Sequence, residues 1–377
     1  MSHRPGRLRR LCRAFTVLAL TAAVGAPGTV AFGDSPHRPG SLRPWVNSCV
    51  RHQGPEGLVN CLGKRARQEA ASRPGPSQTR LTSTIDELAT PTAGSSPVGI
   101  TAGPDDALWF TENAANAVGR VTTAGTFTEY SVPTSGSGPA GITAGPDGAL
   151  WFTESNADKI GRITTGGTVT EYALPTFGAY PWGITTGPDG ALWFAESGAG
   201  KIGRITTGGS ITEYTLPTLA AFPLSITTGP DGALWFTEVL SGSIGTITTG
   251  GSVTEYAVPS SGSLPIGITS GPDGNLWFTD AGASQIGQVT TAGVFTAYNL
   301  TDPLFFPFPW GITTGPDGAL WFTENVGNDI GRITTSGTIS ELSVPTFGAS
   351  PSEIATGSDG NLWFTENTAS QIGKVTP

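Results

Sequence analysis

The chain is poor in charge, sulfur and histidine. Only 13% of its 377 residues are charged, and it contains one Met, three Cys and three His. The histidines are His3, His37 and His52, and the last cysteine is Cys61. Residues 84–377 therefore cannot form a Ser-His-Asp triad or a Cys-His pair, which excludes the common nucleophilic hydrolases.

Turn-forming residues are abundant instead. The chain has 54 Gly and 30 Pro, and many turn formers with few helix formers predict an all-β protein of many short strands. The glycines recur at fixed positions and belong to turns, so they do not indicate a phosphate-binding loop.

The first 33 residues have the pattern of a signal peptide. A basic head runs from Arg4 to Arg13, the apolar stretch 14–26 follows, and small residues lead to Gly33. The apolar stretch is too short to cross a bilayer as a helix, so no stable membrane span is expected. We expect a secreted protein from which residues 1–33 are removed.

Residues 34–80 form a basic arm rich in Pro and Gly, expected to be a poorly ordered tether in front of a domain at 81–377. Cys49 and Cys61 lie in this arm, and an even pair of cysteines in an exported chain predicts a disulfide. Two free thiols are the alternative. Zinc is disfavoured because only His52 lies near the pair.

The net charge of −9 hides two parts of opposite sign. Residues 34–83 include eight basic and three acidic residues, whereas from Thr84 onward there are seven basic and 26 acidic ones. An acidic body repels nucleic acid and anionic lipid, so neither is expected as a partner. We expect a monomer whose arm is a solvated linker or contacts cell-wall polyanions.

One unit of 42 residues is repeated seven times. Its period is set by tryptophans, with a single longer step of 44 residues: Trp109, Trp151, Trp193, Trp235, Trp277, Trp321 and Trp363. Each unit has four β-prone runs, such as Gly-Ile-Thr and Ala-Leu-Trp-Phe, separated by turns of the Gly-Pro-Asp-Gly type. Four antiparallel strands in a unit of this length form one propeller blade.

The two ends of the repeat predict how the ring closes. Thr84–Leu88 matches an outermost strand with no blade before it, and the last unit stops at Val375, after its third strand. Pairing of these segments would complete the last blade and leave no exposed sheet edge. The sequence therefore predicts an all-β, seven-bladed propeller with four antiparallel strands per blade.

One face of this propeller is predicted to carry the functional site. The loops entering the innermost strands open on it, and seven carboxylates that end the Trp-Phe-Thr-Glu phrase stand beside them. Such carboxylates either satisfy backbone amides or hold a hard cation such as Mg²⁺ or Ca²⁺. Glu196 and Glu324 are the candidate metal ligands.

The loops on the same face become aromatic in the later blades. The candidate ligand-binding residues are Tyr180, Trp182, Phe222, Phe308 and Trp310. Aromatic rings over a concave surface stack on sugars or flat ligands. The alternative is that these rings only fill the gaps between blades.

The repeated phrase resembles that of the virginiamycin B lyase (streptogramin lyase) family. The resemblance rests on Gly-Ile-Thr-x-Gly-Pro-Asp-Gly-x-Leu-Trp-Phe-Thr-Glu, followed by Ile-Gly-Arg-Ile-Thr and Glu-Tyr-x-Leu-Pro, and covers residues 84–377. It implies a seven-bladed propeller and a Mg²⁺-dependent lyase that opens a cyclic antibiotic at its ester linkage by elimination.

The resemblance also implies a His base at the x of Pro-x-Gly-Ile, a metal-binding Glu two residues before it, and a metal-binding Trp-Phe-Thr-Glu carboxylate. The positions of the His hold other residues: Val98, Ala140, Trp182, Leu224, Ile266, Trp310 and Ser352. So do those of the upstream Glu: Ser96, Gly138, Tyr180, Phe222, Leu264, Phe308 and Ser350. The catalytic residues are thus unknown, and a base would have to be a carboxylate of raised pKa, such as Glu196 or Glu324.

Three hypotheses remain open at this point. The first is a module that binds a small molecule, a glycan such as a cell-wall fragment, or a peptide on its aromatic and acidic face. The second is a divergent metal-dependent lyase or hydrolase that uses ring carboxylates. The third is a structural or protein-interaction propeller, which burial of Trp182 and Trp310 between blades would favour.

Overall fold

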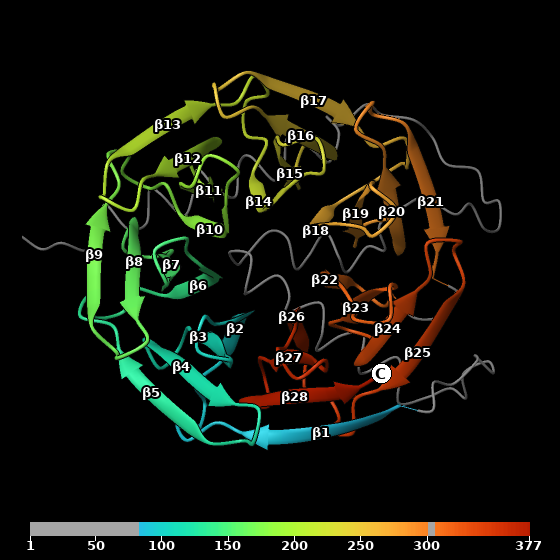
Figure 1. Ribbon diagram of the computed structural model, residues 1–377. Coiled ribbons are helices and arrows are strands. Elements are labelled where there is room, and N and C mark those ends of the chain that lie inside the picture. Colours follow the sequence, from blue (N-terminus) through green and yellow to red (C-terminus); the bar gives the residue numbers. More distant parts are fainter. Residues whose placement is uncertain (1–82, 301–305) are drawn as a thin grey trace, which may run out of the picture.

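The computed structural model describes residues 83–300 and 306–377. These residues form 28 β-strands in seven four-stranded sheets, which stand as blades around a central axis (Figure 1). The predicted fold and number of blades are therefore confirmed. The predicted signal peptide at 1–33, the arm at 34–80 and the pair Cys49 and Cys61 lie outside the described residues. In the part that is described, no helix is long and apolar enough to cross a membrane.

Each blade consists of four strands that lie side by side, in order from the axis to the outside. The innermost strands are β2 (Pro97–Ala102), β6 (Pro139–Ala144), β10 (Pro181–Thr186), β14 (Pro223–Thr228), β18 (Pro265–Ser270), β22 (Pro309–Thr314) and β26 (Pro351–Thr356). The second strands are β3 (Ala107–Glu112), β7 (Ala149–Glu154), β11 (Leu192–Glu196), β15 (Leu234–Glu238), β19 (Leu276–Asp280), β23 (Leu320–Glu324) and β27 (Leu362–Glu366). The third strands are β4 (Ala117–Thr122), β8 (Lys159–Thr164), β12 (Lys201–Ile205), β16 (Ser243–Ile247), β20 (Gln285–Val289), β24 (Asp329–Ile333) and β28 (Gln371–Thr376). The outermost strands are β5 (Phe127–Ser131), β9 (Val169–Ala173), β13 (Ile211–Thr215), β17 (Val253–Ala257), β21 (Phe295–Asn299), β25 (Ile339–Ser343) and β1 (Thr84–Ala89).

The ring closes by pairing the two ends of the described chain. Strand β1 pairs antiparallel with β28, with Ile85 opposite Val375, and becomes the outermost strand of blade seven. In Figure 1 the blue strand β1 lies along the outside of the red strand β28. This is the predicted closure, and it joins segments from opposite ends of the repeat into one sheet.

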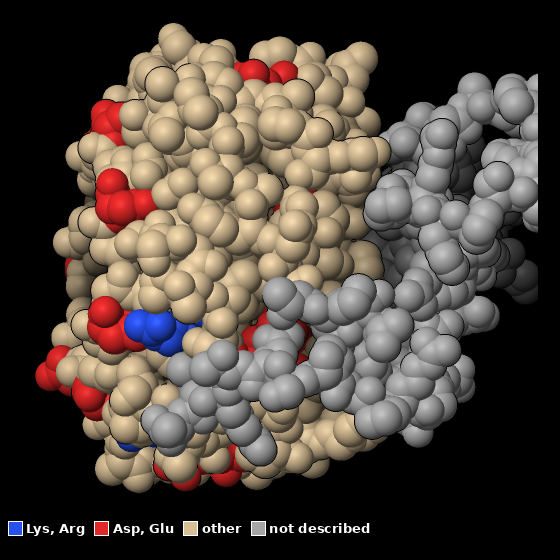
Figure 2. Space-filling model, turned by 90° about the vertical axis from the view of Figure 1, so that its right-hand side faces the viewer, with Lys and Arg blue, Asp and Glu red and all other residues tan. Residues whose placement is uncertain are grey.

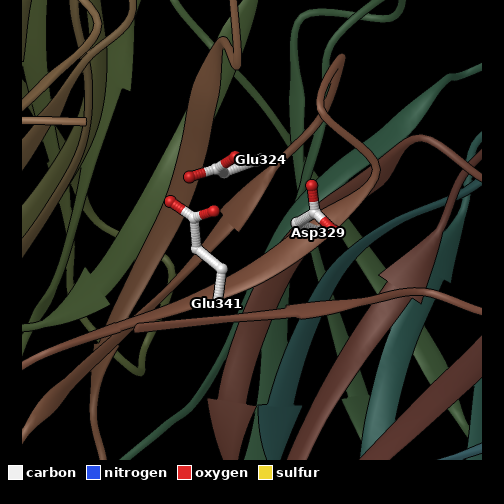
Figure 3. Close-up of side chains that lie close together, drawn as sticks. All are labelled: Glu324, Asp329 and Glu341. Atoms are coloured by element: carbon white, nitrogen blue, oxygen red, sulfur yellow. The ribbon is translucent and has the colours of Figure 1, made fainter. Parts of the chain in front are cut away.

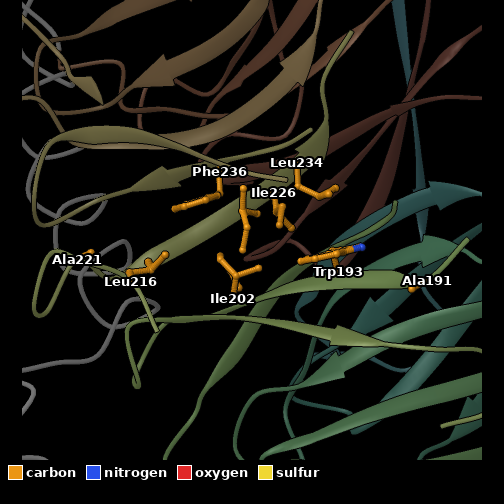
Figure 4. Packing of buried hydrophobic residues seen from close by; sticks show 10 residues of the cluster. Ala191, Trp193, Ile202, Leu216, Ala221, Ile226, Leu234 and Phe236 are labelled. Atoms are coloured by element: carbon orange, nitrogen blue, oxygen red, sulfur yellow. The ribbon is translucent and has the colours of Figure 1, made fainter. Parts of the chain in front are cut away.

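The second strands are buried because a blade covers each of their two faces. Trp193 of blade three packs against Leu234 and Phe236 of blade four (Figure 4), and the same contact recurs around the ring. The tryptophan also stacks on a tyrosine of its own outermost strand, with 5.6 Å between the ring centroids of Trp193 and Tyr214. Truncating one such buried aromatic to Ala costs about 3 to 5 kcal/mol.

The turn aspartates have a structural role. Asp105 accepts a hydrogen bond from the indole of Trp109 (2.9 Å) and another from Arg120 (2.6 Å). Burial raises the pKa of Asp105, but these bonds lower it more, so that the pKa ends below its ordinary value. The turn is thus fixed to the second and third strands of its blade.

A threonine of each second strand, in all blades but one, fastens neighbouring blades together. Thr111 accepts a hydrogen bond from the backbone N–H of Gly99 (2.9 Å) and donates one to the carbonyl of Ala140 in the next blade (2.5 Å). In blade three the position is held by Ala195, so that this link is missing there. The threonines hold the start of each innermost strand, which is where the candidate site lies.

Candidate functional site

A cavity of about 150 Å³ lies on the propeller axis, where the innermost strands converge (Figure 1). Most of its lining is apolar: Val98, Gly99, Ile100, Ala140, Gly141, Ile142, Trp182, Gly183, Ile184, Leu224, Ser225, Ile226, Ile266 and Glu353. We call this space the axial cavity. Seven residues occupy the x of the Pro-x-Gly-Ile phrase, one in each blade. Five of them line the axial cavity: Val98, Ala140, Trp182, Leu224 and Ile266.

A β-bulge at the start of each innermost strand directs these residues to the axis. In blade three Pro181 pairs with Glu196, but the regular register resumes only at Ile184, which pairs with Phe194. The two residues between, Trp182 and Gly183, are left out of the ladder and line the axial cavity. Bulges of this kind re-aim side chains at functional sites.

Blade seven departs from the other blades at the second position of its bulge. Five blades have Gly there and blade four has Ser225, whereas blade seven has Glu353. Of the described residues that line the axial cavity, Glu353 alone is titratable. Burial raises its pKa to about 7, although a hydrogen bond from the Trp310 side chain acts in the opposite direction.

Four of the five predicted ligand-binding residues lie together. Trp182, Phe222, Phe308 and Trp310 share one apolar cluster with Phe306 and with Leu224, Ile266, Ala281, Val239 and Val326. We call this set the aromatic cluster. It spans blades three to six and adjoins the axial cavity through Trp182, Leu224 and Ile266.

The members of the aromatic cluster differ in how much surface they expose. Phe308 and Trp310 are buried, with 2% and 6% of their surface exposed, and their rings stack with centroids 6.0 Å apart. Trp182 and Phe222 are half-buried. Packing between blades therefore accounts for Phe308 and Trp310, while Trp182 and Phe222 keep surface that a ligand can contact.

Tyr180 lies apart from the aromatic cluster and is 48% exposed. Its φ of 47° is in the left-handed region, as are those of Phe222 (56°) and Phe308 (52°). In each case the carbonyl accepts a hydrogen bond from the loop after the second strand, for example from Ser197 to Tyr180 (3.2 Å). Ser96 (52°) and Ser350 (56°) at the same place have the same φ, so the conformation belongs to the repeat, and the large side chains here bear its cost of about 1 to 3 kcal/mol.

The seven carboxylates that end the second strands are buried inside their blades. None has more than 3% of its surface exposed: Glu112, Glu154, Glu196, Glu238, Asp280, Glu324 and Glu366. Burial, followed by the negative charge of Glu213 on the outermost strand, raises the pKa of Glu196 to about 8; Lys201 opposes this shift and Asp158 adds to it. These groups therefore belong to the blade interior and do not form a surface ring.

The outermost-strand glutamates are satisfied by other groups. Glu213 accepts hydrogen bonds from the backbone N–H and the hydroxyl of Thr176 (3.1 and 2.5 Å) and from Lys201 (2.7 Å). With Lys201 beside it, the pair Glu196 and Glu213 already has a cation. Blade three thus offers little reason for a divalent metal at Glu196.

Blade six has an acid where blades two and three have a lysine. Asp329 pairs with Glu324 in the register in which Lys201 pairs with Glu196. Glu324, Asp329 and Glu341 bring carboxylate oxygens within 4.8 Å of one another, the one such group found in residues 83–300 and 306–377. Figure 3 shows them converging from β23, β24 and β25. Carboxylate oxygens are the donors that Mg²⁺ and Ca²⁺ prefer, and Glu324, a predicted metal ligand, has two further carboxylates beside it.

Acidic groups outnumber basic ones on the surface of the described residues. Figure 2 shows one side of the propeller, which is mostly uncharged, with acidic side chains mainly along its edges and fewer basic ones. The basic groups of the described residues are paired with acids, as Lys159 is with Glu171 (2.8 Å) and Arg162 with Asp147 (2.7 Å). The exposed surface therefore favours cationic over anionic partners.

Comparison with known proteins places this architecture in a family. The model of the Virginiamycin B lyase family matches residues 83–308 and 223–377. A streptogramin B lyase structure is 39% identical, with a TM-score of 0.75, over 78% of this chain and 97% of that one. The selenomethionine-substituted virginiamycin B lyase from Staphylococcus aureus is 40% identical, also with a TM-score of 0.75, over 78% of this chain and 99% of that one.

A third similar structure contains a ligand. It is a catalytically inactive variant of the Staphylococcus aureus lyase with quinupristin, again 40% identical with a TM-score of 0.75, over 78% of this chain and 99% of that one. The inactivating change in that protein replaces a histidine by alanine. No histidine is present in residues 84–377 of this chain.

The residues at the family's metal positions do not fit a Mg²⁺ ion here. Of the two metal positions that the resemblance implies, only the second-strand carboxylate is present, and it is buried inside its blade. The axial cavity contributes a single carboxylate, Glu353, whereas Mg²⁺ requires six oxygen ligands in near-octahedral geometry. No catalytic step through a metal follows from these residues.

Three functional candidates were not predicted from the sequence. Glu353 was detectable as the one acid in a Pro-x-Gly-Ile phrase, which in blade seven reads Pro351-Ser-Glu-Ile354. Asp329 was detectable as an acid at a lysine position. Glu341 gave no separate signal, because five other outermost strands have a Glu at the same place.

Proposed function

Because the chain belongs to the virginiamycin B lyase family, we propose that its propeller binds a ligand at the mouth of the axial cavity, against the aromatic cluster. The ligand would be a small molecule, a peptide or a glycan. The observation that carries this proposal is the position of Trp182. It belongs to the aromatic cluster, lines the axial cavity, and occupies the x position of the Pro-x-Gly-Ile phrase of its blade.

The remaining exposed surface of Trp182 and Phe222 supports binding. An indole that is half-buried in a rigid frame loses little conformational entropy when it stacks on a ligand. The strained backbone at Phe222 and Phe308 holds their large side chains on the same face. A similar protein holds quinupristin, which makes quinupristin a suitable first ligand to test against these rings.

Loss of the family's base argues against the same chemistry. At the x positions there are Val, Ala, Trp, Leu, Ile and Ser, none of which accepts a proton at neutral pH. The second-strand carboxylates have raised pKa values, for example about 8 for Glu196, but they are enclosed in the blades and out of reach of a substrate. The divergent lyase is therefore the second candidate, favoured only by the carboxylates around Glu324.

Isothermal titration with quinupristin, soluble peptidoglycan fragments and cello-oligosaccharides tests the proposal. We expect at least one of them to bind, and Trp182→Ala to weaken that binding by about tenfold or more. Phe347→Ala is the matched control, because Phe347 is 76% exposed in the equivalent kind of loop in blade seven. Equal affinities of Trp182→Ala and wild type for every bound ligand would contradict the proposal.

The same samples distinguish binding from turnover. Incubation of quinupristin with the protein, with Mg²⁺ or with EDTA, is followed by mass spectrometry. Unchanged quinupristin in both reactions is expected for a binding module. Ring opening that EDTA abolishes would favour the divergent lyase instead.

We also propose that the protein is secreted as a monomer. The support is the pattern of residues 1–33 together with the acidic body from Thr84 onward, which disfavours anionic surfaces. N-terminal sequencing of the protein from culture medium tests removal of the leader, and sedimentation tests the monomer. Retention of residues 1–33 on a cell-associated chain would contradict secretion.

A further inference from the structure

Glu353 is an acid at a position where the fold normally excludes side chains. The Gly residues at the equivalent positions are packed against the next blade; a Cβ on Gly99 would lie 2.4 Å from the carbonyl oxygen of Ala140. Blade seven accommodates a whole Glu side chain there, and its Oε2 comes within 3.0 Å of a Cβ built on Gly311. The side chain therefore lies against the innermost strand of blade six, in the lining of the axial cavity.

Among the described residues, the surroundings of Glu353 supply no positive charge. None of those that line the axial cavity is Lys, Arg or His. The innermost strands on either side, β2 and β22, contain no ionisable residue. The nearest second strands, β27 and β23, each contribute one acid, Glu366 and Glu324.

These two acids do not compensate or control Glu353. The shift in the pKa of Glu366 comes from burial and from Glu87, which lies on the outermost strand of its own blade. Glu324 lies with Asp329 and Glu341 of blade six. The pKa of Glu353 responds only to burial and to the Trp310 side chain. Glu353 thus has one hydrogen-bond donor, the Trp310 side chain, and no charged partner among the described residues.

We propose that Glu353 binds a cationic amine or ammonium group of the ligand inside the axial cavity, with Trp182 on the facing wall. This inference rests on the proposed function, since it names the chemical class of the group that enters the site. A lone carboxylate in an apolar enclosure is stabilised most by a partner of opposite charge. Indole faces attract the same cations, and the acidic body raises their local concentration.

A metal ion is a poorer occupant than an organic cation. A divalent metal needs six or more oxygen ligands, whereas the cavity lining offers one carboxylate and the hydroxyl of Ser225. An alkylammonium group is satisfied by one carboxylate together with aromatic and carbonyl contacts. The volume of about 150 Å³ also suits the end of an alkylamine chain.

Binding should be linked to protonation of Glu353. Because the free carboxyl has a pKa of about 7, at pH 6 a cation must displace a proton when it binds. Affinity is therefore expected to rise about tenfold per pH unit below that pKa and to level off above it. Calorimetry in buffers of different ionisation enthalpy should detect release of about one proton per bound cation at pH 6.

The experiment uses the purified full chain and a pair of probes that differ only in charge. These are Nα-acetyl-lysine methylamide and its neutral counterpart Nα-acetyl-norleucine methylamide, titrated between pH 5.5 and 8.5. We expect the lysine probe to bind and the norleucine probe to bind at least about tenfold more weakly. Equal binding of the two probes would overturn the proposal.

Two variants of Glu353 keep the result independent of folding. Glu353→Gln preserves the shape, and Glu353→Gly restores the residue that five other blades have. Both should lose the preference for the lysine probe and the pH dependence, while Phe347→Ala, at an exposed position outside the cavity lining, should keep both. Lysine-probe affinity that is unchanged in Glu353→Gln would overturn the proposal.

The outcome is separable from that of the proposed function. If quinupristin or a glycan binds in a Trp182-dependent manner but the lysine probe does not bind, the cation site is refuted and the proposed function stands. If the lysine probe binds through Glu353 while no larger ligand depends on Trp182, the cation site is supported and the proposed role of the aromatic cluster fails.

Discussion

The hydroxyl of Thr365 donates a hydrogen bond to the carbonyl of Val98 at 2.7 Å, which joins the last blade to the first. The same hydroxyl accepts a hydrogen bond from the backbone N–H of Glu353 at 3.1 Å. One side chain thus fixes the closing point of the ring and the bulge that places Glu353 in the axial cavity. A change at Thr365 is therefore expected to affect both the closure of the ring and the position of Glu353 in the axial cavity.

Thr365→Val should therefore destabilise the propeller. Two buried backbone groups lose a partner, and the expected loss in the free energy of unfolding is about 1 to 3 kcal/mol, measured by denaturant titration. Thr246→Val is the control, because the hydroxyl of Thr246 has no hydrogen-bond partner among the described residues. Equal stability of the two variants would contradict a role for Thr365 in closing the ring.

The buried second-strand carboxyls predict that stability falls as the pH rises. The ordinary pKa of a Glu side chain is 4.5. Burial is the main cause that raises the pKa of Glu154 to about 7. Burial together with the charge of Glu213 raises the pKa of Glu196 to about 8. A raised pKa in the folded state gives stability that is complete below pH 4.5 and is lost as the pH rises through 7 to 8. The melting temperature should therefore be higher near pH 6 than near about pH 9.

Glu196→Gln tests the origin of this dependence. The amide cannot ionise, so the variant should exceed wild type by at least about 1.4 kcal/mol near about pH 9, the equivalent of one pKa unit. Its advantage should disappear near pH 5. A parallel shift of both curves at all pH values would show that ionisation of Glu196 is not involved.

The fold was predictable from the sequence because it is written in repeated local signals. The period of the tryptophans and the offset of Thr84 against Val375 give the number of blades and the closure, and the structure confirms both. The site was less predictable, because it depends on how bulges aim side chains toward the axis. Whether a carboxyl at the end of a second strand points to the surface or into the blade, as Glu196 does, is decided by packing against the third and outermost strands.

Asp359 should contribute to the loss of folding stability at low pH. Burial raises its pKa, but hydrogen bonds from Asn361, Trp363 and Lys374 outweigh this and lower it from 3.8 to about 2. The stability that this group provides is present above pH 3.8 and is lost as the pH falls toward 2. Asp359→Asn should cost about 1 to 2 kcal/mol at neutral pH and flatten the acid limb of an unfolding curve.

Asp231→Asn is the matched control for this turn. Asp231 accepts a hydrogen bond from Trp235 (3.0 Å), but the third-strand residue opposite that tryptophan is Thr246 instead of a basic residue. Its substitution should therefore cost less than that of Asp359. An equal cost would mean that the indole, and not the ion pair with Lys374 (3.0 Å), accounts for the contribution of Asp359.

The final prediction concerns the three carboxylates of blade six. Asp329→Lys gives this blade the residue that Lys159 and Lys201 provide in blades two and three, each within 2.8 Å of its outermost-strand glutamate. Replacing a like charge near Glu324 and Glu341 by an opposite one should raise stability at neutral pH by about 1 kcal/mol, measured by thermal unfolding in EDTA. Asp86→Lys, on the exposed outer surface of β1, controls for the change in net charge. A stabilisation by Asp329→Lys no larger than that of the control would show that the three carboxylates do not repel one another. Repeating the comparison in millimolar Ca²⁺ or Mg²⁺ tests the metal role predicted for Glu324. A bound ion would stabilise only the chain that retains Asp329.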